Sequence, residues 1–228
     1  MIIESRFHGP DGSGNGGYVA GLVAGQVAAE TVTVALRQPP PLETELWVSV
    51  DDERGHSVKV WDGDSLVAEG LAGAIVVPPV APVPFEEAVL AAEKYKGVDG
   101  HPFPRCFVCG PEREVGDGLR ISPGVVAEGV VAAPWVPEEV PESAVVWAAL
   151  DCPGAWSDDP QARPAVLGTM TAQVVDVPAA GERCVVMGMT RSREGRKLHA
   201  ATALYGEDGR LLGRGEQIWI EVSRSFGT

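Results

Sequence analysis

The pattern of hydrophobic and polar positions predicts the same order of helix and strands twice along this chain of 228 residues. In the first half, a strand predicted over residues 2–7 and a glycine-rich turn precede an apolar stretch over residues 18–29. Its larger apolar residues recur at helical spacing, and Ala and Gly occupy the other sides. This pattern predicts a helix buried on all sides. Turn signals then separate strand-like runs at residues 31–36, 43–50, 56–61 and 65–77.

The second half repeats this order. Opening strands are predicted at residues 119–121 and 125–133, and a helix over residues 144–152 with its stop at Pro153 and Gly154. Strand-like runs follow at residues 166–175, 183–191, 198–205 and 211–222. The last hairpins of the two halves even resemble each other in letters, at residues 62–70 and 207–215. The chain therefore reads as an internal repeat.

A strand, one buried helix and an antiparallel meander, repeated once, predict an α+β fold of the double hotdog type. In this fold two antiparallel sheets are each expected to wrap around a central helix. The predicted division is an N-terminal hotdog half over residues 1–80, a linker over 81–118 and a C-terminal half over 119–228. The linker combines an extended Pro-rich segment, a short amphipathic helix over residues 85–95 and a Cys-x-x-Cys connector.

Charge and composition narrow the possible partners. The formal net charge is −14, from 32 acidic and 18 basic residues, which disfavours nucleic acid because phosphate binding needs clustered Lys and Arg. No run of residues is long and apolar enough for a spanning helix, and residues 1–7 lack the features of a secretory signal. We therefore expect a cytoplasmic protein without a membrane partner. Two fused halves can bury the surface that single hotdogs bury by dimerising, so a monomer and a homodimer both stay open.

One acidic residue stands out on the second predicted helix. Asp151 follows a run of apolar residues, and burying an unpaired carboxylate costs several kcal/mol unless its pKa changes. A charge in such a place usually has a function, although a position in the last helical turn could instead point it to solvent. The helix of the first half carries no acid, which predicts one working site per chain.

Residues 144–222 resemble the second hotdog of the acyl-CoA thioesterase II family. In that family an Asp on the helix, a Thr or Ser on the next strand and a Gln on the last strand hold the attacking water. The matching positions here are Asp151, Thr169 and Gln217. The sequence departs from the pattern after Asp151, where Cys152, Pro153 and Gly154 replace an apolar continuation.

The resemblance implies a hydrolase that acts on an acyl thioester of coenzyme A. Asp151 would be the general base, a role worth typically 10²–10⁴-fold in rate. Thr169 and Gln217 would orient the water, although each alone could be an ordinary strand residue. The oxyanion would be held at a helix N-terminus by the loop with His8 and the run Asn15, Gly16 and Gly17. That loop could equally be a glycine-rich turn needed only for packing.

Four basic residues cluster in a predicted hairpin tip. Arg191, Arg193, Arg196 and Lys197 could bind the phosphates of coenzyme A. A solvated charged turn is the simpler explanation of the same residues.

The pair Cys106 and Cys109, with His101 nearby, raises the question of a zinc site. A structural zinc ion needs four ligands, and Cys152 and Cys184 lie in predicted core elements without a second paired motif. Packing of the connector against the second half is the favoured role of this pair. Because hydrolysis needs only water and the substrate, we expect no metal or other cofactor.

Two other functions stay open. A hotdog can act as an enoyl hydratase or dehydratase, but the Asn-Pro and His expected soon after the catalytic Asp are absent here. A non-catalytic protein that binds acyl chains or acyl-CoA would also explain the small residues of the first helix. Release of free thiol from acyl-CoA separates these possibilities from a thioesterase.

Overall fold

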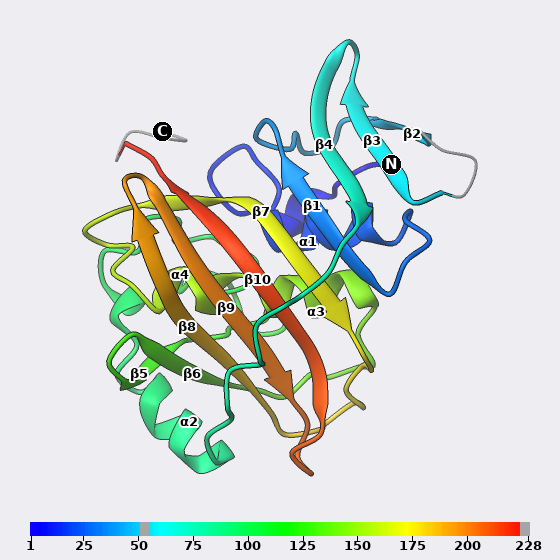
Figure 1. Ribbon diagram of the computed structural model, residues 1–228. Helices are drawn as coiled ribbons and strands as arrows, with labels where there is room; N and C mark the ends of the chain where they lie inside the picture. The colour runs from blue at the N-terminus through cyan, green and yellow to red at the C-terminus, as the bar shows by residue number, and fades with distance from the viewer. Residues whose placement is uncertain (51–54, 224–228) are drawn as a thin grey trace.

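The computed structural model describes residues 1–50 and 55–223, and its strands form one ten-stranded antiparallel sheet (Figure 1). The strands follow one another across the sheet in the order β2-β3-β4-β1-β7-β10-β9-β8-β6-β5. The first half contributes β1 (Thr31–Leu36), β2 (Trp47–Val50), β3 (Ser57–Asp62) and β4 (Ser65–Ala72). The second half contributes β5 (Gly124–Ala127), β6 (Val130–Trp135), β7 (Ala165–Val174), β8 (Cys184–Glu194), β9 (Lys197–Tyr205) and β10 (Leu211–Glu221).

The strand order confirms the internal repeat. The two halves meet at the seam between β1 and β7. Going outward from this seam, each half shows the same order of the four strands that follow its helix: the first strand, then the fourth, the third and the second. The first half gives β1-β4-β3-β2 and the second gives β7-β10-β9-β8. The two halves are therefore copies of one supersecondary unit, joined edge to edge.

The prediction of two separate sheets is not confirmed. Strand β1 pairs with β7 over residues 31–35 and 169–173, so the two halves share one continuous ladder. The hydroxyls of Thr33 and Thr171 add a bond of 2.8 Å across this seam. Joining the halves satisfies backbone groups on two strands that would otherwise be open edges.

Two helices lie side by side behind the sheet in Figure 1: α1 (Gly16–Ala24) and α3 (Ser143–Ala149). They run antiparallel, because Gly17 faces Trp147 and Asp151 whereas Gly21 faces Ala144. A Cβ atom on Gly21 would lie 2.6 Å from the Cα of Ala144, so the helices touch backbone to backbone. Apolar residues of both helices join one hydrophobic core.

Three predicted elements differ in the structure. Residues 2–7 contain a 3₁₀ turn, η1 (Ser5–Phe7), in place of a strand, and residues 119–121 are irregular. Helix α3 ends before Pro153, and a second short helix, α4 (Cys152–Trp156), continues through the predicted stop. Proline has no N–H for the α3 ladder but is well suited to the first turn of a new helix. Asp151 therefore lies at the junction of two helices.

The connector packs against the second half with its helix and contacts the first half further along. Helix α2 (Phe85–Ala92) lies beside β5 and β6, and η2 (Lys96–Val98) follows. The backbone N–H of Phe107 donates to the His8 carbonyl at 2.8 Å, and Phe107 and Val108 are buried. The segment with Cys106 is thereby held between the start of α1 and the α3–α4 junction.

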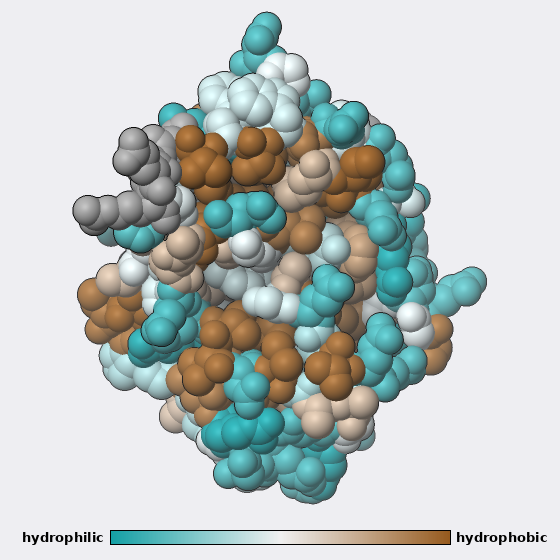
Figure 2. Space-filling view, turned by 90° about the vertical axis from the view of Figure 1, so that its right-hand side faces the viewer, coloured by the Kyte–Doolittle hydropathy of each residue, from teal (hydrophilic) through white to brown (hydrophobic). Residues whose placement is uncertain are grey.

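The surface mixes apolar and polar side chains. Several large apolar residues are exposed, among them Trp47, Leu71 and Val175. Figure 2 shows one face on which apolar groups are interrupted by polar ones. Among the described residues, no helix has the length and apolar character needed to cross a membrane.

Candidate functional site

A cavity of about 250 Å³ lies where the start of α1, the connector and the α3–α4 junction meet strands β7 and β10. The exposed residues Arg37 and Gln38 belong to its wall, so the cavity reaches the protein surface. Its lining combines polar and sulfur-bearing side chains with apolar ones, including Asn15, Cys106, Asp151, Trp156, Leu167 and Trp219. The cavity is large enough for several waters or part of a small molecule.

Asp151 is the buried acid of this cavity. Its side chain is only 2% exposed, which confirms the predicted burial. Carboxylate atom Oδ2 accepts hydrogen bonds from Asn15 Nδ2 at 3.0 Å and from the Gly17 backbone N–H at 3.1 Å. Atom Oδ1 is buried and has no hydrogen-bond partner among the described residues. One oxygen is therefore fixed by two donors, whereas the other has no protein partner in a residue that lines the cavity.

Burial changes the ionisation of this carboxyl group. Loss of solvation raises the pKa of Asp151 to about 8, and negative charge at Cys106 acts in the same direction. The bonds from Gly17 and Asn15 oppose the shift. A carboxyl group with such a pKa can take up and release a proton near neutral pH, as a general base must.

The start of α1 supplies the donors. Asn15 is the N-cap, where its Oδ1 accepts from the Tyr18 N–H at 2.9 Å while its amide nitrogen reaches Asp151. Gly17 donates to Asp151, and the N–H of Gly16 has no acceptor among the described residues. Of the residues predicted for the oxyanion, Asn15 and Gly17 thus hold the acid, and Gly16 keeps a free donor in the cavity wall.

Glycine is required at both helical positions. A Cβ atom at Gly17 would lie 2.4 Å from the Cβ of Asp151, and one at Gly16 would lie 2.8 Å from the Cβ of Leu167. Real side chains do not approach so closely. The small residues that the sequence shows here therefore allow α1 to approach the acid.

Gln217 is buried next to the acid but is bonded to the backbone. Its Nε2 donates to the Leu150 carbonyl at 2.8 Å and to the Asp151 carbonyl at 3.1 Å. Its Oε1 accepts from Trp219 Nε1 at 2.9 Å. These bonds tie β10 to the α3–α4 junction, so Gln217 positions Asp151. The role of Gln217 in orienting the attacking water, which the sequence resemblance implies, stays a prediction.

Thr169 lies apart from this group. It stands opposite Ala35 and Ile218 in the sheet, between Met170 and the irregular pairing near Gly168. Met170 is fully buried on the helix side, and neighbouring strand residues point to opposite faces. Among the described residues that line the cavity, Thr169 is not present. The structure does not bring its hydroxyl to Asp151, and its predicted role is untested.

The other predicted residues are also engaged elsewhere. The backbone of His8 pairs with Gly14 and Phe107, and burial lowers the pKa of the His8 ring. In the basic hairpin, Arg191 donates to the Pro78 carbonyl, Arg193 pairs with Asp158 and Glu221, and Arg196 donates to the Glu221 carbonyl. Lys197 is exposed. None of these residues is among the described ones that line the cavity, and phosphate binding stays a prediction.

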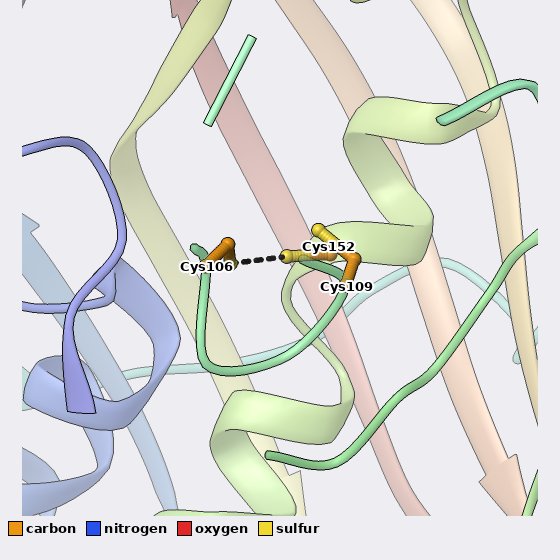
Figure 3. A group of neighbouring side chains, drawn as sticks. All are labelled: Cys106, Cys109 and Cys152. Atoms are coloured by element: carbon orange, nitrogen blue, oxygen red, sulfur yellow. Dashed lines mark hydrogen bonds between the residues drawn. The ribbon is translucent and has the colours of Figure 1, made fainter. Parts of the chain in front are cut away.

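A group that sequence reasoning did not assemble lies on the same wall. The sulfur atoms of Cys106, Cys109 and Cys152 are all within 4.8 Å of one another (Figure 3). The paired spacing of Cys106 and Cys109 was visible in the sequence. Cys152 could not be added to them, because only the fold brings α4 against the connector.

Solved structures with the same architecture define the class of the fold. A putative thioesterase from Novosphingobium aromaticivorans superposes with a TM-score of 0.64 at 15% identity, over 98% of this chain and 94% of that one. The tesB protein of Mycobacterium avium subsp. paratuberculosis gives 0.62 at 12% identity, over 98% and 91%. An acyl-CoA thioesterase II from Mycobacterium marinum gives 0.56 at 11%, over 92% and 91%. The chain therefore shares the double hotdog fold of these solved structures.

Sequence comparison adds nothing to this likeness. No protein-family model matches the chain, and neither does any curated protein. The similarity is one of fold, and one fold can carry many different functions.

Proposed function

We propose that this protein hydrolyses an acyl thioester, with coenzyme A as the thiol part of the substrate. The observation that carries the proposal is the state of Asp151: a buried carboxylate with one oxygen clamped by Asn15 and Gly17 and the other unpaired in a cavity wall. A water bonded to Oδ1 would be oriented and deprotonated there. The thioesterase names of the structural neighbours agree with this chemistry.

In this mechanism the substrate carbonyl lies in the cavity between Asp151 and the start of α1. The carboxylate takes a proton from water as the oxygen attacks the carbonyl carbon, and the carbonyl oxygen becomes negative. The free N–H of Gly16, at the positive end of the α1 dipole, would stabilise that oxygen. Collapse of the intermediate expels the thiolate of coenzyme A, which regains the proton.

The fixed geometry of the site would add to the effect of the base. Gln217 holds the carbonyls of Leu150 and Asp151, and Asn15 and Gly17 hold the carboxylate. A prepositioned base loses little freedom when the transition state forms. Gln217 acts on the reaction through Asp151 and is a positioning residue.

The test is release of free thiol from acyl-CoAs of increasing chain length by the purified full chain. We expect Asp151→Asn to lower the rate 10²–10⁴-fold, because the amide keeps the shape and loses the base. Asp159→Asn is the matched control: Asp159 is exposed on the loop after α4, and its bond from the Ala162 N–H can be kept.

Three outcomes would count against the proposal. Equal rates for the parent chain and Asp151→Asn would remove Asp151 from the mechanism. Tight binding of acyl-CoA without thiol release would identify a binding protein. Loss of enoyl-CoA absorbance without thiol release would identify a hydratase.

A further inference from the structure

The cavity wall carries a second reactive group that the proposed hydrolysis does not use. Cys106 and Cys109 come from the connector loop, and Cys152 begins α4 (Figure 3). All three side chains are buried and none forms a disulfide. Three thiols gathered in one buried place call for an explanation, since packing alone does not require sulfur.

The distances between these sulfurs match a metal centre. A tetrahedral Zn²⁺ with Zn–S bonds of about 2.3 Å has sulfur atoms about 3.8 Å apart. Cys106 Sγ and Cys152 Sγ are separated by 3.7 Å, and all three sulfurs fit within 4.8 Å. An ion could bind all three with small side-chain rotations.

The surroundings of the sulfurs are those that bound thiolates need. Asn15 Nδ2 lies 3.7 Å from Cys106 Sγ, and His101 Nε2 lies 3.3 Å from Cys109 Sγ. The N–H of Phe103 donates to His101 Nδ1 at 2.9 Å, so the ring proton is on Nε2 and points at the sulfur. His101 is therefore a donor to a ligand and not a ligand itself.

The connector is shaped for this geometry. The Gly110 N–H donates to the Cys106 carbonyl at 2.9 Å, which closes a tight turn around the Cys-x-x-Cys pair. A Cβ atom at Gly110 would lie 2.5 Å from the Cys106 nitrogen, so the turn needs glycine. Such a turn directs two sulfurs to the same side, and α4 supplies the third.

We propose that Cys106, Cys109 and Cys152 bind one Zn²⁺, with His101 and Asn15 as hydrogen-bond donors to the sulfurs. All three cysteines line the cavity, so the fourth coordination position faces a space that can hold water. A disulfide is the alternative use of such thiols. A disulfide would use two sulfurs and leave the third without a partner. The N–H groups of Asn15 and His101 would stabilise it little, because its sulfurs carry no negative charge. The proposal is independent of the proposed hydrolysis, because it concerns metal content alone.

The test is the zinc content of the full chain, purified with reductant, stripped with a chelator, reloaded with Zn²⁺ and desalted. We expect one zinc per chain. Cys106→Ala, Cys109→Ala and Cys152→Ala should each abolish retention. Cys184→Ala is the matched control, because Cys184 is also buried but lies outside the cluster. His101→Ala should keep one zinc and weaken its affinity about 10–100-fold.

A second measurement needs no variant and so does not depend on their folding. Co²⁺ added to the metal-free parent chain should give thiolate-to-cobalt charge-transfer absorption and the visible bands of tetrahedral cobalt. Absence of both bands, or no zinc retained by the reduced parent chain, would overturn the proposal. Full retention by the Cys106 and Cys152 variants would do the same. A Cys106–Cys152 disulfide in the purified protein, together with no zinc binding after its reduction, would also overturn the proposal.

Discussion

The two ends of the α1–α3 helix pair differ, although the fold that contains them is a repeat. At one end, Gly17 brings a backbone N–H onto the carboxylate of Asp151 beside a cavity. At the other end, Gly21 brings α1 onto Ala144 and Trp147, and apolar contacts fill the space. Both ends use glycine for close approach, and the buried carboxylate lies at one of them. The repeat supplies the scaffold, and a few side chains decide which end has a site.

Among substitutions that test this difference between the two ends, Gly17→Ala should have the largest effect on hydrolysis. The added carbon would press on the Asp151 Cβ and the Trp147 carbonyl, and so displace the carboxylate from its donors. Because small misplacements of catalytic groups can cost about 100-fold, we expect a loss of thioester hydrolysis of that size. Gly25→Ala, at the C-cap of the same helix, meets only ordinary contacts and is the control. Equal activity of the two variants would show that the clamp on Asp151 is not needed.

Asn15→Ser separates the clamp from the helix cap. Serine is a good N-cap, so α1 should persist, but the amide donor to Asp151 is lost. A hydrogen bond to a charged group is worth roughly 1.5–3 kcal/mol, which corresponds to a 10–100-fold slower hydrolysis. Steady-state rates measured beside thermal unfolding would check this. A slower rate with a proportionate loss of folded protein would assign Asn15 to stability alone.

The pH dependence should report Asp151 directly. Only its ionised form can act as base, so in protein freed of metal the hydrolysis rate should rise with pH and level off above about 8. The folded-state pKa lies above the unfolded one, so ionisation opposes folding, and stability should fall as pH rises from about 4 to about 8. Asp151→Asn should flatten both curves. A hydrolysis rate that does not change between about pH 6 and about pH 9 would contradict the assignment of Asp151 as the base.

Gln217→Leu should act mainly on stability. It leaves the Trp219 indole N–H and the Leu150 and Asp151 carbonyls without their partner in a buried site. Each unsatisfied group costs about 1–3 kcal/mol, so denaturant unfolding should show a loss of at least that size. Gln217→Glu keeps the shape and one acceptor, and it should be less stable still above neutral pH. An unchanged midpoint for the leucine variant would remove Gln217 from the junction.

Thr169→Val should have the smallest effect. The hydroxyl does not line the cavity among the described residues, and valine suits a strand. We expect hydrolysis within about twofold of the parent rate, as for substitutions away from key contacts. A loss approaching that of Asp151→Asn would restore the role that the sequence resemblance gave it.

The sequence predicted the repeated order of elements and the burial of Asp151, because both follow from local patterns. The boundaries of β1 and the start of β4 agree with prediction, since β-branched runs and turn residues mark them. The single sheet was missed because pairing of β1 with β7 joins residues that are distant in sequence. A strand was expected over residues 2–7, but the structure has a 3₁₀ turn there.

The same limit applies to the site. Gln217 could be found by resemblance, but its bonds to two helix carbonyls depend on how β10 packs under the α3–α4 junction. Cys152 was recognised as a core residue, and only the connector path places it beside Cys106. The basic hairpin illustrates the reverse case: its charges are clustered in sequence, but Arg193 pairs with two acids, and Arg191 and Arg196 donate to backbone carbonyls.

The clamp on Asp151 joins positions 134 and 136 residues apart, one partner from each half. Neither copy of the duplicated unit can therefore change freely at this point. A substitution in the N-terminal copy, which has no acid of its own on its helix, would therefore alter the hydrogen bonds of the acid in the C-terminal copy. Separately expressed halves would each lack part of this clamp, so the two copies depend on each other for it.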